Sequence, residues 1–314
     1  MADSSFKLRT PDEAFANLPD YPFTGHYLDD LPSLAGMQMH YLDEGPQDAE
    51  VVWLLLHGNP AWSYLWRHWV PALVAQGHRV VAPDLIGFGK SDKPLEESFH
   101  HYEYHRNVLL ELVERLELSN IHMAVQDWGG LFGLTLPMAA PQRYAALLVM
   151  NTALATGDRD LSDGFIAWRE FNRDKPSFSM AGLFQRSVEH LSAAEAAAYA
   201  APFPNDQYRA AIRRFPEMVM DSLDADGAAI SREALQFWKS QWQGRSAMAI
   251  GAADPVLGPP TMRALAKVIN GCPEPLLLEE GGHFLQEWAH PQLDYRTAEM
   301  PQGLVGWAID QLVV

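Results

Sequence analysis

The chain has 314 residues, of which 48% are apolar and 20% are charged. This is the composition of a globular protein, and it excludes an intrinsically disordered or collagen-like chain. Forty acidic against 23 basic side chains give a net charge of −17, and a field of that sign repels nucleic-acid backbones and anionic membrane surfaces. We therefore expect neither nucleic acid nor a membrane as a partner.

Cys272 is the only cysteine, so neither an internal disulfide nor a multi-thiolate zinc site can form within the chain. The first residues mix charged and polar side chains without an apolar stretch, and no apolar run approaches the ~20 residues of a membrane span. These features are typical of a protein of a reducing compartment, and we expect a cytoplasmic location.

Short continuous apolar runs alternate with a helical pattern in the first half of the chain. Continuous rather than alternating apolar residues indicate strands that are buried on both faces of a parallel sheet, and such runs occupy 51–56, 79–82, 121–125 and 145–150. The segment 103–116 places apolar side chains three and four residues apart, which predicts a helix packed on that sheet. The alternation predicts βαβ units.

The pattern changes after Asn151, where the segment 152–240 predicts helices interrupted by prolines. Ser192 followed by Glu195 is a capping-box signal for the start of one of them. Strand-like runs resume at 247–250 and 276–278, with a helical pattern over 262–269 between them. We therefore predict an α/β protein with a mostly parallel central sheet flanked by helices, whose core domain comprises 1–151 and 241–314, and an α-helical cap domain at 152–240.

The motif VQDWGG at 125–130 places Asp127 directly after a predicted strand and before two glycines and a helix. A strand, a sharp turn and a helix carry the nucleophile of α/β-hydrolases, where the motif is G-x-S-x-G. Here Asp127 stands in place of the serine, and Val125 stands in place of the first glycine. The motif predicts an α/β-hydrolase fold with a carboxylate nucleophile.

A carboxylate changes the reaction that such a site favours. Aspartate, with an ordinary pKa of about 3.9, is already ionised at neutral pH and needs no base to attack. Displacement of a good leaving group from a saturated carbon gives an alkyl ester, which must then be hydrolysed. The site therefore also needs a base for water and an oxyanion hole.

Candidates for these roles follow other predicted strands. His283 comes after the strand-like run near 278 through two glycines, and Asp254 follows the strand near 250, where it can orient the imidazole. The order of nucleophile, acid and histidine is that of the α/β-hydrolase triad. The turn HGNP follows the first long strand, so we predict the backbone N–H groups of Asn59 and Trp128 as oxyanion donors.

The motifs HGNP, PDLIGFGKSDKP, VQDWGG, GAADPVLG and EEGGHF occur in this order, and over nearly the whole chain the sequence resembles a haloalkane dehalogenase of the α/β-hydrolase superfamily. It is most similar to the subfamily in which two tryptophans hold the halide. The resemblance gives these roles to Trp128 and, in DGFIAWRE, to Trp168. For the side chain of Asn59 it leaves two roles open, contact with the halide or placement of the hydrolytic water.

The resemblance also implies an apolar substrate pocket, which would desolvate the nucleophile and suit an alkyl halide. Its predicted walls are Leu131, Phe165, Phe215, Pro216, Val219 and Leu257. The implied substrates are small halogenated alkanes and the products an alcohol, a halide ion and a proton, formed by a monomer or small homo-oligomer.

The resemblance implies neither a metal nor an organic cofactor, and the sequence offers two metal-like patterns that we interpret otherwise. His101 and His105 are four residues apart, but the glutamate between them does not occupy the position that it has in HExxH, so we predict a solvated helix start. The segment GDRDLSDG lacks the glycine and glutamate positions of an EF-hand and is predicted to be an acidic loop.

Other functions remain open from the sequence. An epoxide hydrolase uses the same nucleophile with two cap tyrosines as proton donors, and Tyr199 and Tyr208 are candidates. A fluoroacetate dehalogenase would need arginines near the nucleophile, and VQDWGG has none. A non-catalytic ligand-binding protein on a hydrolase fold is the alternative outside enzymes, which the complete triad disfavours.

Overall fold

The computed structural model describes residues 6–289 and 303–313. In these residues, eight strands form one sheet in the order β10-β9-β8-β7-β4-β5-β3-β2. Their bounds are β2 His26–Leu28, β3 Met39–Glu44, β4 Val52–Leu56, β5 Arg79–Pro83, β7 Ile121–Gln126, β8 Tyr144–Met150, β9 Arg245–Gly251 and β10 Leu276–Leu278. A separate two-stranded sheet pairs β1 (Lys7–Leu8) with β6 (Lys93–Pro94).

The sheet is parallel from β10 to β5, and β3 and β2 extend it in the antiparallel direction. All residues of β4, β5 and β7 are buried, as expected for strands covered on both faces. The structure therefore confirms the strands that the continuous apolar runs predict. The antiparallel strands β2 and β3 lack such runs, because polar residues occur in both: His26 of β2 is exposed, and Asp43 and Glu44 of β3 are half-buried.

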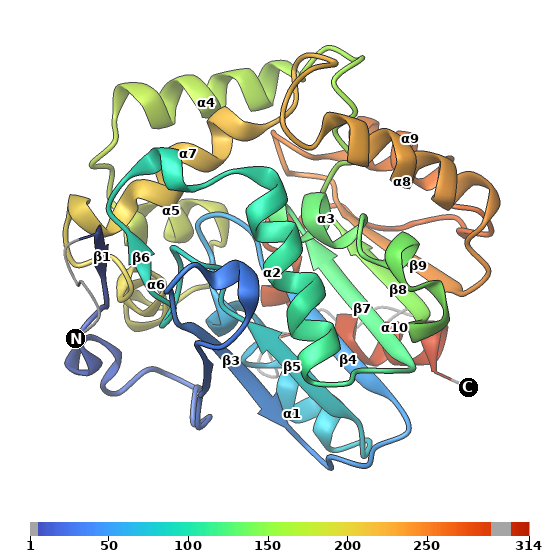
Figure 1. Cartoon of the computed structure of the whole chain (residues 1–314), viewed down its shortest axis with the longest axis horizontal. Helices are drawn as coiled ribbons and strands as arrows, with labels where there is room; N and C mark the ends of the chain where they lie inside the picture. The colour runs from blue at the N-terminus through green and yellow to red at the C-terminus, as the bar shows by residue number, and fades with distance from the viewer. Residues whose placement is uncertain (1–5, 290–302, 314) are drawn as a thin grey trace.

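Helices cover both faces of the sheet (Figure 1). The helices of the described residues are α1 Trp69–Val74, α2 Tyr102–Arg115, α3 Trp128–Gly133, α4 Asp163–Asp174, α5 Met180–Ser187, α6 Ala193–Ala200, α7 Ala210–Met218, α8 Ala228–Ser240, α9 Pro259–Ala266 and α10 Gly303–Leu312. Helix α2 lies within one residue of its predicted bounds, and it buries apolar side chains that are three and four residues apart, as predicted. No helix of the described residues is long and apolar enough to cross a membrane.

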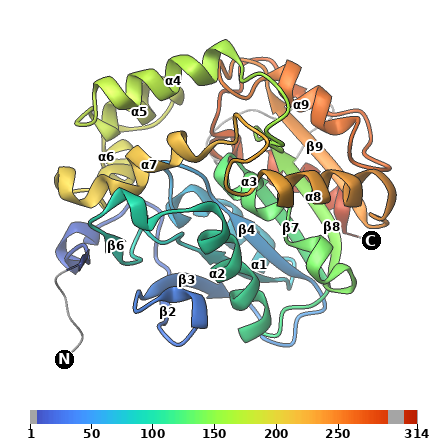
Figure 2. The same cartoon turned by 45° about the horizontal axis from the view of Figure 1, so that its top comes forward.

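The segment between β8 and β9 begins with four helices, α4 to α7, that gather beyond one end of the sheet (Figure 2). The capping box at the start of α6 is confirmed, because Ser192 and Glu195 exchange both hydrogen bonds. Helix α8 follows them and contacts the end of α3, where Trp238 donates its indole N–H to the carbonyl of Leu134 at 2.7 Å.

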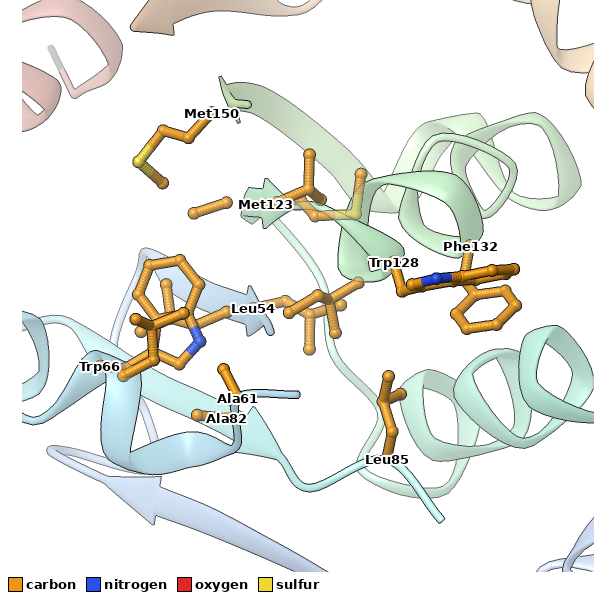
Figure 3. Close-up of a cluster of buried hydrophobic side chains, with 14 of the residues drawn as sticks. Leu54, Ala61, Trp66, Ala82, Leu85, Met123, Trp128, Phe132 and Met150 are labelled. Atoms are coloured by element: carbon orange, nitrogen blue, oxygen red, sulfur yellow. The ribbon is translucent and has the colours of Figure 1, made fainter. Parts of the chain in front are cut away.

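The apolar core lies between the sheet and its helices. Figure 3 shows part of it, with Leu54 of β4 and Met123 of β7 on the strand side and Trp128 and Phe132 on α3. Leu54 and Phe132 are fully buried, and Trp128 is 3% exposed. Because interiors pack closely and side chains there have little freedom, this core holds the start of α3 in place against the sheet.

Candidate active site

Asp127 occupies the sharp turn between β7 and α3 and is therefore placed at the carboxyl end of the sheet, where α/β proteins position their chemistry. Its backbone has φ 49° and ψ −124°, a strained conformation for a residue with a side chain. A Cβ atom at Gly129 would overlap the backbone oxygen of Leu56. The glycine is thus required, because here the helix and the neighbouring strand approach too closely for any side chain.

Two backbone N–H groups hold the carboxylate of Asp127. Asn59 N–H donates to Oδ1 at 2.7 Å, and Trp128 N–H also bonds to the carboxylate. These are the donors predicted for the oxyanion hole, and the distance is the one that such donors require. An ester at Asp127 would keep its carbonyl oxygen within their reach.

His283 and Asp254 complete a triad with Asp127. The Nδ1 atom of His283 is 2.8 Å from Oδ2 of Asp254, and its Nε2 atom is 3.7 Å from Oδ2 of Asp127. Asn151, directly after β8, donates to Asp254 at 2.7 Å, and Val256 N–H donates to its other oxygen at 2.8 Å. The structure thus brings the three predicted side chains together with the geometry of a nucleophile, a base and an orienting acid.

The site shifts the pKa of each of its three titratable groups. Burial raises the pKa of Asp127, against the attraction of His283 and the two N–H donors. Burial also opposes ionisation of Asp254, but His283, Asn151 and Val256 outweigh it and lower the pKa. Burial disfavours protonation of His283, yet the charges of Asp254 and Asp127 prevail and raise the pKa to about 9.

A cavity of about 330 Å³ opens above the nucleophile and is mostly apolar. The predicted site residues that line it are Asp127, Trp128, Leu131, Phe165, Val219 and Leu257. The wall is completed by the segment after β8 and by α9, including Leu154 and Pro260, which the sequence did not identify. A carboxylate at the base of an apolar cavity is poorly solvated and suited to attack a small apolar substrate.

Two other predicted residues, Phe215 and Trp168, are not part of the described lining of this cavity. Phe215 is fully buried and packs against the indole of Trp128, with 4.8 Å between ring centroids. Trp168 is half-buried in α4 and packs on Phe171 and Phe178, with 5.9 Å between the ring centroids in each pair. The structure does not place Trp168 in the cavity lining with Trp128, so its halide-binding role stays a prediction, as does the wall role of Phe215.

The side chain of Asn59 makes a contact that the sequence did not predict. In an α-helix the carbonyl of Ile212 would accept from residue 216, but Pro216 has no N–H. The amides of Asn59 and Asn172 both donate to this carbonyl, each at 3.3 Å. Asn59 therefore joins the core to cap helix α7, and Pro216 contributes by freeing the acceptor, whereas its role as a pocket wall stays a prediction.

A buried ion-pair network connects the cap to the segment that carries His283. Arg67, 1% exposed, binds both oxygens of Glu287 at 2.6 and 2.8 Å and Glu195 of α6 at 2.9 Å. Tyr199 of α6 also donates its hydroxyl to Glu287. Glu287 lies in the 3₁₀ helix Leu285–Ala289, just after the imidazole, so this network fixes the end of the catalytic segment.

The metal-like histidines have other roles in the structure. His101 caps α2 by accepting from Tyr104 N–H. The prediction of a solvated helix start is wrong for His105, whose ring is buried against Phe132 and Phe215 and has a nitrogen 3.0 Å from a nitrogen of His100. The segment GDRDLSDG forms a loop that ends at the start of α4, as the sequence predicts.

Comparisons with known proteins agree with this geometry. The family model described as the alpha/beta hydrolase fold matches residues 52–290. A haloalkane dehalogenase of Psychrobacter cryohalolentis is 44% identical over 285 residues, which cover 89% of this chain and 93% of that protein. A haloalkane dehalogenase of Mycolicibacterium paratuberculosis is 38% identical over 302 residues, covering 95% and 99%.

Among solved structures, the tetrameric haloalkane dehalogenase DpaA from Paraglaciecola agarilytica superposes with a TM-score of 0.88 at 46% identity. The match covers 90% of this chain and 94% of DpaA. Together with the nucleophile turn, the held carboxylate and the histidine–aspartate pair, these similarities show that the chain belongs to the haloalkane dehalogenases of the α/β-hydrolase fold.

Proposed function

We propose that the protein hydrolyses haloalkanes to an alcohol, a halide ion and a proton through an ester of Asp127. The observation that carries this proposal is the carboxylate itself: two backbone N–H groups hold it at the base of an apolar cavity, with an imidazole 3.7 Å away. In the first step Oδ2 attacks the carbon that bears the halogen. The C–O bond forms as the carbon–halogen bond breaks, and the halide leaves with the electron pair.

The departing halide needs donors that do not compete as nucleophiles, and an indole N–H is a donor only. Trp128 lines the cavity beside the nucleophile and is the first candidate. Trp168 is the second candidate by family resemblance, and it would have to turn from its present packing on Phe171 and Phe178.

In the second step His283 takes a proton from water, and the hydroxide attacks the carbonyl carbon of the ester. The resulting oxyanion is stabilised by the N–H groups of Asn59 and Trp128. As this intermediate collapses, the bond from the aspartyl carbon to the alkoxide oxygen breaks and the hydroxyl proton of the intermediate passes to that oxygen, which gives the alcohol and restores the carboxylate. The imidazolium then releases its proton to solvent. Because the ester carries no charge, one of the two carboxylates that raise the pKa of His283 is lost after alkylation, which makes the imidazole a more available base at the stage that needs it.

The epoxide hydrolase alternative is less well supported, because its proton donors are missing from the cavity. The hydroxyl of Tyr199 is buried and donates to Glu287. Tyr208 is half-buried beside α7, and neither tyrosine lines the described cavity.

The alternative of a haloacid substrate is also less well supported. Such a substrate would require arginines beside the nucleophile, and the described cavity lining contains one arginine, Arg159.

The substrate class can be tested directly by halide release from 1-chlorobutane, 1-bromobutane and 1-bromohexane, with 1,2-epoxybutane as the competing substrate. We expect multiple turnovers on the haloalkanes and loss of activity in Asp127→Ala. Bromide should be released faster than chloride, because it is the better leaving group. Turnover of the epoxide alone would overturn the proposal.

The two tryptophans can be separated by chloride inhibition of 1-bromobutane turnover. We expect Trp128→Phe to weaken chloride inhibition by about tenfold or more, because it removes a hydrogen bond to a charged partner. If Trp168 turns to the halide, Trp168→Phe should act similarly. An unchanged inhibition constant in Trp168→Phe would leave it a packing residue of the cap, and Trp307→Phe, on α10, provides the matched control.

We also propose a cytoplasmic location, supported by the lone cysteine, and a small homo-oligomer, since DpaA is described as tetrameric.

A further inference from the structure

Gln126 is the last residue of β7 and directly precedes the nucleophile. Its side chain is fully buried and faces the catalytic imidazole. The amide nitrogen lies 2.8 Å from Nε2 of His283 and 3.2 Å from the carbonyl oxygen of the same histidine. The proposed reaction assigns no role to this residue.

These two contacts determine which groups donate. A backbone carbonyl can only accept, so the Gln126 atom that faces it must be the NH₂ group rather than the oxygen. The same NH₂ group also faces Nε2 of His283, which must then accept through its lone pair. The proton of the neutral imidazole therefore resides on Nδ1, where it is donated to Asp254 at 2.8 Å.

The charged groups around the imidazole favour its protonation, which the hydrogen bond from Gln126 opposes. Asp254 and Asp127 favour the imidazolium form, and the groove on the α5 side adds Arg186, Glu189, His190 and Glu280 at the rim. An imidazolium would direct an N–H at the N–H of Gln126, with 2.8 Å between two donors. Gln126 is thus the contact that opposes protonation at the nitrogen that must accept a proton from water.

We propose that Gln126 is a positioning residue that favours the unprotonated form of Nε2 of His283, against the pull of the two carboxylates, and keeps this nitrogen aimed at the ester of Asp127. This inference rests on the proposed function, since it concerns the base of the second step. In the neutral imidazole the amide N–H of Gln126 occupies the lone pair of Nε2. In the alkyl-enzyme, water takes over that lone pair as it delivers its proton, while the bond from Gln126 to the carbonyl of His283 holds the amide nearby.

The test compares Gln126→Met, which removes the donor at similar size, with Gln126→Glu, which replaces the amide by an acceptor. Hydrolysis of the Asp127 ester formed from 1-bromobutane is followed by rapid quench and mass spectrometry between pH 5 and 9.5. A hydrogen bond to the neutral imidazole disfavours the imidazolium. Both changes remove this bond, so both should move the acidic limb of the pH–rate profile of ester hydrolysis to higher pH. We expect a shift of up to about one pH unit for Met and about one to three for Glu.

Formation of the ester serves as the internal control, because attack by Asp127 needs no base. Gln243, exposed at the opposite end of the sheet, supplies the matched variants Gln243→Met and Gln243→Glu, whose acidic limb should coincide with that of the wild type. An unshifted limb in Gln126→Met overturns the inference, whatever Gln126→Glu does, because the N–H donor is then without effect. Absence of any ester in the wild type would instead overturn the proposed function.

Discussion

Replacing His283 by glutamine should stop turnover and leave the alkyl group attached to Asp127. The carboxylate can still displace the halide, but no base remains to activate water, and loss of a general base costs about 10²- to 10⁴-fold. Incubation of His283→Gln with 1-bromobutane should add one butyl group per chain. Mass spectrometry of the intact protein and of the peptide containing Asp127 measures this directly.

Two variants make the result specific. His26→Gln, at an exposed position on β2, should turn over normally and carry no adduct. The double variant Asp127→Ala with His283→Gln should also remain unmodified, since it lacks the attacking oxygen. An unmodified single variant after prolonged incubation, or an adduct on another residue, would contradict the division of roles between nucleophile and base.

Arg67→Leu should destabilise the folded protein strongly, and unfolding in urea measures this as a lower free energy of unfolding. The change leaves Glu287, which is fully buried, and the mostly buried Glu195 without their common cation. Removing one partner of a buried ion pair typically costs about 3–5 kcal/mol. Arg115→Leu removes an exposed pair with Asp30 and should cost about 1 kcal/mol or less.

The pH dependence of this effect has a defined sign. Burial opposes ionisation of Glu195, but hydrogen bonds from Ser192 and Arg67 outweigh it and lower the pKa to about 2, from an ordinary 4.5. A lowered pKa stabilises the folded state above the ordinary value, and this stabilisation is lost as the pH falls toward 2. The difference in the free energy of unfolding between the wild type and Arg67→Leu should therefore become smaller as the pH falls from 5 to 2. If Arg67→Leu and Arg115→Leu lowered the free energy of unfolding equally at pH 7, the result would contradict a stabilising role of the buried ion-pair network around Arg67.

The parts of the fold that the sequence predicts are those with a strong local signal. Parallel strands such as β4 are buried on both faces and their residues are continuously apolar, and the turn at Asp127 is marked by its glycines. The antiparallel strand β3 is not marked in this way, because Asp43 and Glu44 follow its apolar residues. Its place in the sheet depends on pairing with β5, which is far away in the sequence.

The same distinction applies to the site. Asp127, Asp254 and His283 each follow a strand in an order that is informative by itself. Gln126 and Asn151 occupy equivalent positions, at the end of β7 and directly after β8. Their residue type does not predict a role, because a side-chain amide at the end of a strand has many structural uses. The packing of Trp168 and the hydrogen bond of the Asn59 side chain depend on how the cap sits over the core, which no local pattern encodes.

The carbonyl of Ile212 has a consequence for attempts to exchange caps between related enzymes. Pro216 inside α7 removes one backbone hydrogen bond of the helix, and the side-chain amides of Asn59 and of Asn172 on α4 donate to the carbonyl that is left without it. A transplanted cap whose helix lacked this proline would satisfy its own backbone and offer no acceptor to Asn59. The residue that supplies one of the two N–H groups at the nucleophile would then lose its attachment to the cap, so a chimera could fold well and still catalyse poorly.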